Sequence, residues 1–517
     1  MINDSQNDAG AIDRRTMMKA GGAAAALLAP GVAQAARGGA DQAAVLKAID
    51  SNQGAAIQRL ADWIKLPSIA AEKRNIDEGV AHMIALAQDA GFQTAKPVPT
   101  GGVPSVLATL DSGAKHWIGV YFMYDVKQFD PAEWSSPPLE ARLVDRPGLG
   151  KVMVGRGAVN QKGPEMSFLA AVRAFKDSGR KLPVNIALIA EGEEEIASPN
   201  FPKAISHPDV LPILQKCVGV FIPSASQAMD GTSTLTLGAK GAVELQLISS
   251  GERWGRGPTK DIHSSNFARV DSPAWRLVQA LDTLMKPDGH TIAVDGWYDN
   301  VLPLSAREKA LIAETAKRTS EEEVKRQLGV KHWINDESWV QALERLASQP
   351  TINIQGLVAG YTGPGGKTIL PHRAVAKMEF RLTPAMTKEE AIAKFNAHLK
   401  KHGFDDLEVQ VTGGYGPTIT NEDSALVRSE KAVMERLGVA YTIIPRSAGS
   451  WPGVVFSGPP LNLPAAQWGM GHGSGAHGPD EYFLIESANP KVMGMAEASK
   501  AYVALLYEIA KQAAIRA

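Results

Sequence analysis

The sequence predicts an α/β protein in which one domain is interrupted by a second, α+β domain. Residues 41–238 alternate helical patterns with short, continuous apolar runs, which is typical of a largely parallel sheet covered on both faces. In residues 239–412 the strand patterns instead alternate apolar and polar side chains, as half-exposed strands do. Residues 413–517 return to helix, strand and a long terminal helix, which we expect to rejoin the first domain.

The elements of the first domain are predicted from the spacing of apolar residues. A helix begins near Gly163 and Pro164. Its Phe168, Val172 and Phe175 fall on one face at helical spacing. Buried strands are expected at three short apolar runs, residues 117–126, 184–190 and 218–222.

In the second domain, Ser272 and Pro273 mark the start of a helix. We expect this helix to turn Trp275, Val278 and Leu281 toward the interior. The other predicted elements of the second half are two alternating strands, a charged and solvated helical stretch, and the terminal helix: residues 243–247, 374–382, 306–327 and 490–515.

Composition restricts the classes of partner. The 517 residues include 54 Lys and Arg against 55 Asp and Glu, so the net charge does not favour a nucleic acid or an anionic membrane surface. After residue 35 the sequence has no apolar run long enough to span a bilayer. Cys217 is the single cysteine, which excludes an intramolecular disulfide and a cysteine-based metal site.

The first 35 residues have the pattern of an export signal. Arg14 and Arg15 resemble the twin-arginine consensus, and an Ala-rich stretch with small residues at Ala33 and Ala35 follows. The pattern predicts a twin-arginine signal peptide over residues 1–35 and hence a periplasmic protein. The alternatives are Sec export, or a tail in which the arginine pair occurs by chance.

Four motifs in order along the chain resemble those of the M20 metallopeptidases, in particular the dipeptidases or carnosinase-like amidohydrolases. They are Tyr124-Asp125-Val126 with Trp134-Ser135-Ser136-Pro137-Pro138, Gly155-Arg156-Gly157 with Lys162-Gly163, Glu191-Gly192-Glu193-Glu194-Glu195, and Gly475-Ala476-His477-Gly478. The resemblance implies a three-layer, zinc-peptidase-like catalytic domain (residues 41–238 and 413–517) with an inserted lid or dimerisation domain (residues 239–412). It also implies a homodimer.

The family resemblance implies two zinc ions, but three of the five ligand positions are substituted. Carried over by position, the first His falls on Met123, the bridging Asp on Asn160 and a further Asp on Ser224. Glu195 and His477 are the ligands that remain. Two dications about 3.5 Å apart repel by roughly 19 kcal/mol even at an effective dielectric of about 20, and neutral residues do not offset that repulsion.

We therefore expect an incomplete metal site. An inward turn of Asp125 or His472 would complete the ligands of one ion. Whether the site holds zinc, another metal or no cofactor is left open by the sequence.

Other family positions keep their residues. The resemblance implies that Glu194 is the general base and that Asp125 is a further catalytic residue, at the position of the family's Asp that orients the first His. In a cluster with Glu193, Glu195 and Asp125, Glu194 is expected to have a raised pKa. His263 matches the lid histidine that reaches a neighbouring active site across the family's dimer.

The resemblance also implies a clamp for the carboxylate of a substrate. Arg381 and the turn at Gly449 and Ser450 match the family positions. A guanidinium fork is suited to that task because it can donate two parallel hydrogen bonds to a carboxylate.

Three functions remain open. The first is an M20-type hydrolase that cleaves the amide bond of a dipeptide or an N-acylated amino acid with an incomplete metal site. The second is a metal-independent enzyme in which Glu194 acts as the general base for proton abstraction, elimination or isomerisation of a small carboxylated substrate. The third is a catalytically inactive homologue that binds peptides. In every case the expected partner is a small molecule or peptide with a carboxylate.

Overall fold

A computed structural model describes residues 40–515 of the chain. The twin-arginine segment of residues 1–35 lies outside this range, so the export signal stays a prediction. Within the range, no helix combines the length and the hydrophobicity that crossing a bilayer requires.

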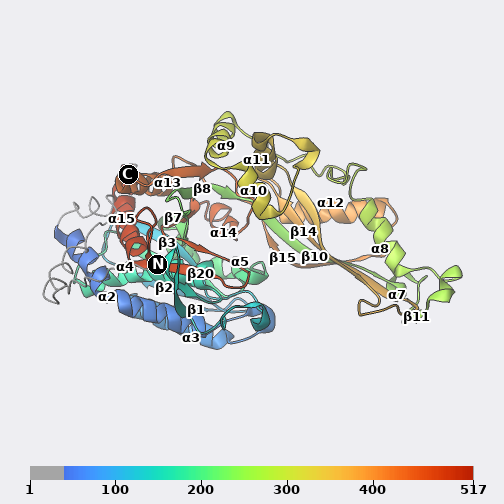
Figure 1. Ribbon diagram of the computed structural model, residues 1–517, viewed down its shortest axis with the longest axis horizontal. Helices are drawn as coiled ribbons and strands as arrows, with labels where there is room; N and C mark the ends of the chain where they lie inside the picture. Colours follow the sequence, from blue (N-terminus) through green and yellow to red (C-terminus); the bar gives the residue numbers. More distant parts are fainter. Residues whose placement is uncertain (1–39, 516–517) are drawn as a thin grey trace, which may run out of the picture.

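A large mixed sheet forms the centre of the molecule's first part (Figure 1). Across the sheet the strands are β1 (Thr94–Val98), β2 (Ser105–Leu110), β6 (Asn185–Glu191), β3 (Trp117–Met123), β7 (Cys217–Pro223), β18 (Ala465–Trp468), β8 (Ser233–Thr236) and β17 (Tyr441–Ile444). The four central strands, β6, β3, β7 and β18, run parallel to one another, as predicted. Antiparallel pairing begins on either side of them, with β1 and β2 at one edge and with β8 toward the other.

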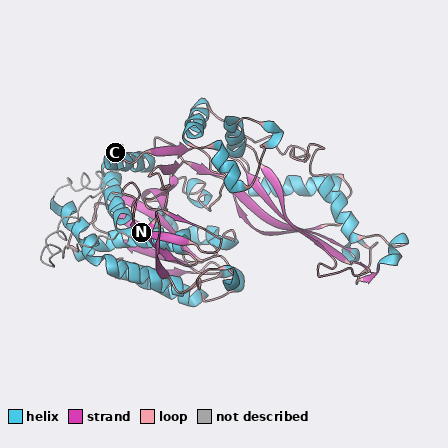
Figure 2. Ribbon diagram, in the orientation of Figure 1, coloured by secondary structure: helices cyan, strands magenta, loops and turns pink. Residues whose placement is uncertain are grey.

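Helices cover both faces of this sheet (Figure 2). Along β3, Val120 and Phe122 pack into one apolar cluster and Tyr121 into the other, because successive side chains of a strand point to opposite faces. This confirms the predicted three-layer arrangement. The first face is covered by α2 (Ala40–Lys65), α3 (Ile76–Ala90), α4 (Gly163–Asp177), α13 (Ala425–Leu437) and α15 (Met495–Ala514), and the second by α5 (Phe201–Ile205), α6 (Leu211–Leu214) and α14 (Val454–Ser457).

A second, four-stranded antiparallel sheet was not anticipated from the sequence. It joins the segments of the chain before and after the insert, because β5 (Gly150–Val154) from the first segment pairs with β20 (Tyr482–Ser487) from the last. Its outer strand has almost no buried side chain, so it lacks the apolar pattern that would have predicted it. In order, the strands are β19 (Gly473–Ser474), β20, β5 and β4 (Arg142–Arg146).

The inserted part has its own antiparallel sheet and its own apolar core. Val243, Leu245 and Leu247 of one strand are buried there, which confirms the alternating pattern predicted from the sequence. The sheet consists of β12 (Thr351–Ala359), β14 (Arg373–Leu382), β10 (Gly241–Ser250) and β15 (Glu408–Tyr415), and it is covered by α8 (Pro273–Asp282) and α12 (Lys388–Lys401).

Short elements complete the described chain. They are the strands β9 (Gly238–Ala239), β11 (Ile262–His263), β13 (Ile369–Leu370) and β16 (Thr418–Ile419), and the helices α7 (Gly251–Trp254), α9 (Ala306–Arg318), α10 (Glu321–Leu328) and α11 (Trp339–Ser348).

The predicted inward face of α8 is wrong for Trp275 and Val278, whereas Leu281 packs against the core as expected. Trp275 is 58% exposed and Val278 is 42% exposed, whereas Leu277 and Ala280 are buried. Apolar residues at helical spacing run along two faces of this helix, so periodicity alone did not decide which face meets the core. Two boundaries also differ. The charged stretch 306–327 is two helices, α9 and α10, and α15 begins at Met495.

Glu430 on α13 is a carboxylic acid inside the core, and its ionisation should affect the stability of the fold. Its side chain is fully buried, and neither carboxylate oxygen has a hydrogen-bond partner within residues 40–515. Burial raises the pKa of Glu430 well above its ordinary value of 4.5. The folded state therefore resists the ionisation that the unfolded chain undergoes, so stability is lost as the pH rises above that ordinary value.

We expect Glu430→Gln to raise the free energy of unfolding by about 1–3 kcal/mol at pH 8 and by much less near pH 4.5. Thermal unfolding across this pH range measures the difference. Glu435→Gln, at an exposed position on the same helix, is the matched control and should change little. A gain that does not grow with pH would contradict the buried-charge explanation.

Candidate active site

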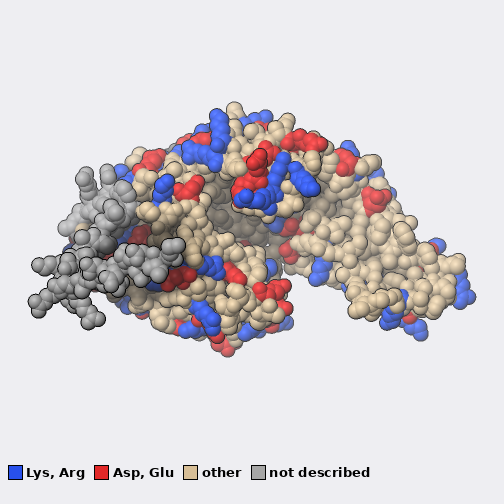
Figure 3. All heavy atoms as spheres, viewed as in Figure 1, with Lys and Arg blue, Asp and Glu red and all other residues tan. Residues whose placement is uncertain are grey.

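The candidate site lies at the carboxyl ends of the parallel strands β3, β6 and β7. Tyr124 and Asp125 follow β3, the short turn Glu194–Ile196 follows β6, and Ser224 follows β7. Because parallel strands end at the same edge of a sheet, residues distant in sequence meet there. In the space-filling view the molecule is notched between its two parts, and charges of both signs are scattered over this face (Figure 3).

Asp125 supports the loop that carries the glutamates. It is completely buried, and its two oxygens accept the backbone N–H groups of Glu194 (3.3 Å) and Glu195 (3.0 Å). Burial, together with the neighbouring Glu195 carboxylate, raises the pKa of Asp125 to about 8. Asp125 therefore fixes the backbone of the loop, and its oxygens are already used by that backbone.

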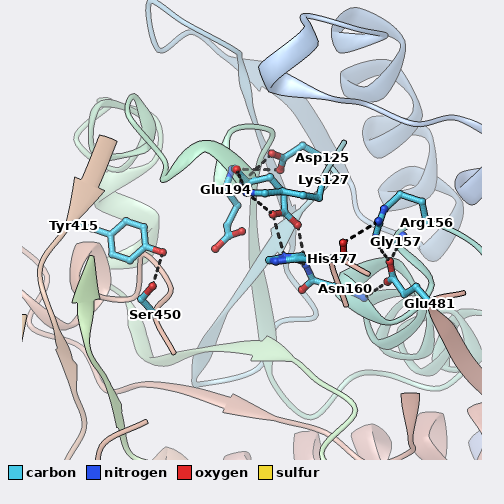
Figure 4. A network of polar contacts seen from close by, with 11 residues as sticks. Asp125, Lys127, Arg156, Gly157, Asn160, Glu194, Tyr415, Ser450, His477 and Glu481 are labelled. Atoms are coloured by element: carbon cyan, nitrogen blue, oxygen red, sulfur yellow. Dashed lines mark hydrogen bonds and ion pairs between the residues drawn. The ribbon is translucent and has the colours of Figure 1, made fainter. Parts of the chain in front are cut away.

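The Glu195 carboxylate is surrounded by three nitrogen atoms (Figure 4). Asn160 Nδ2 donates to Glu195 Oε1 at 2.8 Å, and His477 Nε2 lies 3.2 Å from Oε2. Asn160 Nδ2 and His477 Nε2 are themselves 3.1 Å apart. Lys127 Nζ lies 3.6 Å from Oε2 and donates to the Glu195 carbonyl oxygen at 2.6 Å. Three positions that the sequence assigned to the metal site are thus brought together, with Lys127 added.

The remaining two substituted positions supply no anionic ligand. Met123 is buried, and its backbone N–H donates to Glu165 Oε1 at 2.8 Å. Ser224 Oγ donates to the Ile222 carbonyl oxygen at 3.4 Å. His472 does not turn inward either, because its two ring nitrogens lie within hydrogen-bond distance of Gln227 O (2.8 Å) and Tyr482 OH (3.1 Å).

These residues do not fit a pair of zinc ions. Across residues 40–515 there is no group of three or more His, Cys, Asp or Glu side chains placed to hold a metal. Only Glu195 and His477 keep ligand chemistry, whereas a catalytic zinc normally has three protein ligands. Lys127 adds to the misfit, because a dication about 4 Å from an ammonium group is repelled by about 8 kcal/mol at an effective dielectric of about 20.

A buried ion pair holds the loop that carries Asn160. The Arg156 guanidinium donates to Glu481 Oε2 at 2.8 Å, and both side chains are almost fully buried. Glu481 also accepts the backbone N–H groups of Gly157 (3.0 Å), Val159 and Asn160 (both 2.9 Å). Arg156 Nη2 reaches the carbonyl oxygen of His477 at 3.2 Å. One ion pair therefore positions two residues of the site. Sequence reasoning missed this role, although Arg156 stands in one of the recognised motifs.

Glu194 lies on the open side of this group. Its carboxylate points into the space between His477 and the pair formed by Tyr415 and Ser450 (Figure 4). Burial, with the Glu195 and Asp125 carboxylates nearby, raises the pKa of Glu194 well above its ordinary value, as predicted.

Glu193 does not belong to the cluster in which it was expected. Its Oε1 accepts the Val103 backbone N–H at 3.2 Å and Asn200 Nδ2 at 3.0 Å. The sequence shows three consecutive glutamates, but the short helical turn that begins at Glu194 directs their side chains differently. Instead Glu191, at the end of β6, is buried and accepts hydrogen bonds from Tyr121 OH (2.7 Å) and Ser198 Oγ (3.0 Å).

The residues predicted to form a carboxylate clamp meet beside two strands of the inserted sheet. Arg381 on β14 and Tyr415 on β15 both stand opposite Ala242 of β10, so their side chains lie on the same face. Arg381 Nη1 donates to Ser450 Oγ at 2.7 Å, and Tyr415 OH donates to the same oxygen at 3.3 Å. Glu379 forms an ion pair with Arg381. The structure therefore brings Arg381 and Ser450 together as expected and adds Tyr415, which sequence reasoning missed.

Gly449 borders a cavity beside this clamp. Its backbone N–H donates to Ser447 Oγ at 3.2 Å. The cavity has a volume of about 310 Å³ and is lined mainly by apolar side chains of α9 and α11 and by residues 444–449.

His263 is far from these groups within one chain. It lies on β11, at the end of the inserted part that points away from the large sheet (Figure 1). The ring is exposed, and its Nδ1 lies 2.8 Å from Ser265 Oγ. Its proposed action on the site of another chain stays a prediction.

Comparisons with known proteins agree with this architecture. Residues 124–501 match the family model of peptidase family M20/M25/M40. The chain is similar to human Beta-Ala-His dipeptidase, with 26% identity over 432 residues (77% of this chain and 80% of that protein). It is also similar to Cys-Gly metallodipeptidase DUG1 of Saccharomyces cerevisiae, with 26% identity covering 68% of this chain and 74% of that protein.

A solved structure resembles the whole described fold. The M20 family metallo-carboxypeptidase Sso-CP2 from Sulfolobus solfataricus is 30% identical, with a TM-score of 0.77 that covers 89% of this chain and 99% of that one. The matched family model spans both parts of the large sheet and the insert between them. The chain therefore belongs to peptidase family M20/M25/M40.

Proposed function

We propose that this protein hydrolyses the amide bond of a dipeptide or an N-acylated amino acid without the zinc pair of its family. The observation that carries the proposal is the position of Glu194, between the Tyr415–Ser450 pair and His477 with Asn160 (Figure 4). Arg381 donates to the same Ser450 hydroxyl, and Asn160 donates to Glu195. The dipeptidase names of similar proteins support the substrate class.

The clamp would bind the substrate's free carboxylate. Arg381 presents a guanidinium group, and Ser450 Oγ and Tyr415 OH lie beside it. Charge-assisted hydrogen bonds of this kind orient a substrate as well as hold it. The apolar cavity next to Gly449 offers room for a neighbouring side chain of the substrate.

Glu194 would then act on the amide held between the clamp and His477. It takes a proton from the attacking water and transfers it to the nitrogen of the leaving amine. A raised pKa suits both steps, because the group must accept and release a proton near neutral pH. Asp125 contributes by holding the Glu194 and Glu195 backbone.

Two further proposals concern location and assembly. The twin-arginine pattern supports export to the periplasm. The family resemblance supports a homodimer in which His263 of each chain reaches the active site of the other.

We expect Glu194→Gln to lower kcat by about 100- to 10,000-fold, because it removes the general base. Turnover of a dipeptide and N-acyl amino acid panel, followed by chromatography of the products, measures this. Glu193→Gln is the matched control, since that carboxylate bonds to Val103 and Asn200. Products other than the two hydrolysis fragments would instead indicate proton abstraction, elimination or isomerisation. If the unmodified protein binds these ligands but turns none of them over, and Glu194→Gln leaves their affinity unchanged, the protein is a binding homologue.

Arg381→Met should raise KM by about 10- to 100-fold and leave kcat within about threefold, because a charged hydrogen bond to the bound substrate is lost. Arg373→Met, at an exposed position on the same strand, is the control. The effect should disappear for substrates whose carboxylate is amidated. Equal losses for both substrate types would contradict the assignment of Arg381.

If His263 acts across a dimer, His263→Ala and Glu194→Gln chains should complement each other. A mixed dimer contains one site with both residues intact, so an equal mixture reassembled from monomers should recover about one quarter of the unmodified activity. Steady-state rates before and after mixing give the answer. No recovery, with mixed dimers shown by native mass spectrometry, would place His263 outside the reaction.

A further inference from the structure

Three side-chain nitrogen atoms surround the buried Glu195 carboxylate. Its side chain is only 4% exposed, and Asn160 and His477 approach its two oxygens. A carboxylate removed from water in this way needs positive charge or hydrogen-bond donors close by. Of its three nitrogen partners, Lys127 is the one that carries a permanent side-chain cation.

Lys127 is placed so that its ammonium group also faces outward. One N–H is anchored on the Glu195 carbonyl oxygen, and Nζ lies 3.6 Å from the carboxylate. An ammonium group has three donors. The side chain is 37% exposed, and no further hydrogen bond from Nζ to a protein acceptor is found along residues 40–515. Even if a second donor is directed at the Glu195 carboxylate, one donor remains for a molecule in the site.

The residue comes from a rigid position. Lys127 follows Asp125 and Val126 directly after β3, and the Val126 backbone N–H donates to Ser68 O at 2.9 Å. Asp125 is held by the loop of Glu194 and Glu195. The backbone next to Lys127 and the loop of Glu195 are therefore both fixed, which keeps the cation close to Glu195.

The geometry points to Lys127 as the residue that takes over the positive charge of the family's metal centre and polarises the carbonyl group of the scissile amide. This inference rests on the proposed hydrolysis. As water attacks the carbonyl carbon, the carbonyl oxygen gains negative charge and accepts the free N–H of Lys127. The proton of the water passes to Glu194 and then to the amine nitrogen as the C–N bond breaks, and Lys127 remains protonated throughout.

Metal uptake tests the charge replacement independently of activity. Asn160→Asp would create three potential ligands together with Glu195 and His477, the number normal for a catalytic zinc. We expect Asn160→Asp alone to bind zinc weakly, and the double variant Asn160→Asp, Lys127→Ala to bind about one zinc per chain at least about 100-fold more tightly, since like charges in contact are strongly unfavourable. Calorimetry with zinc alone measures both affinities.

The matched control is Asn160→Asp, Lys96→Ala, because Lys96 lies in an exposed ion pair with Asp209. It should behave as Asn160→Asp alone. Equal zinc affinity for all three variants would overturn the inference that Lys127 holds the cation position.

Kinetics test the catalytic role. Lys127→Met should lower kcat by about 100- to 1,000-fold and change KM by less than about threefold. The reason is that the carbonyl oxygen loses one hydrogen-bond donor as it becomes negatively charged. Lys127→Arg should recover much of the loss, Lys96→Met should have no effect, and a chelator should not change the unmodified enzyme. Thermal unfolding of each variant checks that it is folded.

The two proposals fail in different ways. If the unmodified protein turns over the panel and Lys127→Met retains its kcat, the role of Lys127 is wrong and the hydrolase proposal stands. If the unmodified protein is inactive on the whole panel, the hydrolase proposal and the kinetic role of Lys127 both fail, and zinc affinity alone decides whether Lys127 occupies the cation position.

Discussion

The charge balance at the Glu195 carboxylate governs the rest of this site. A carboxylate that is nearly inaccessible to water must be compensated by nearby charge or by donors, and here Lys127, Asn160 and His477 surround it. Once these nitrogens occupy the space around its oxygens, a pair of dications meets both too few anionic ligands and a competing cation. The same arrangement leaves Glu194 free of such contacts and directed toward the space where a substrate would lie.

Buried polar side chains that do not belong to the reacting groups hold the backbone of the site's loops in place. Glu481 gathers three backbone N–H groups from the loop of Asn160, and its partner Arg156 reaches the carbonyl oxygen of His477. Asp125 does the same for the loop of Glu194 and Glu195. Groups fixed in this way need little rearrangement when charge develops on a substrate, which is the physical basis of electrostatic catalysis in enzymes.

The group formed by Arg381, Tyr415 and Ser450 depends on a different part of the molecule with a separate apolar core. Arg381 and Tyr415 are side by side because two strands pair with the same residue of β10. Ser450 is contributed by the part of the chain that returns to the large sheet. A substrate bound by Arg381, Ser450 and Glu194 would therefore contact both parts of the protein, so that its length is set by the spacing between them.

The sequence by itself determined the layered α/β architecture, the insert and the family, because apolar periodicity and ordered motifs are local properties of the chain. It also identified Glu194, Glu195, Asn160 and His477 as neighbours, and Arg381 with Ser450, since these positions could be carried over from the family motifs. Where two patterns were equally regular it failed, as on α8, whose apolar residues line two faces.

Only the tertiary structure decided which polar groups meet. The outer strand β4 has no buried side chain, and the sheet to which it belongs forms by pairing of β5 with β20, chain segments more than 300 residues apart. Three consecutive glutamates received different environments because a single turn of backbone directs each side chain separately. Lys127 gave no signal in the sequence, since a lysine after a strand is usually a solvated side chain. Its significance arises from the Glu195 carboxylate, which a neighbouring strand of the sheet brings into its reach.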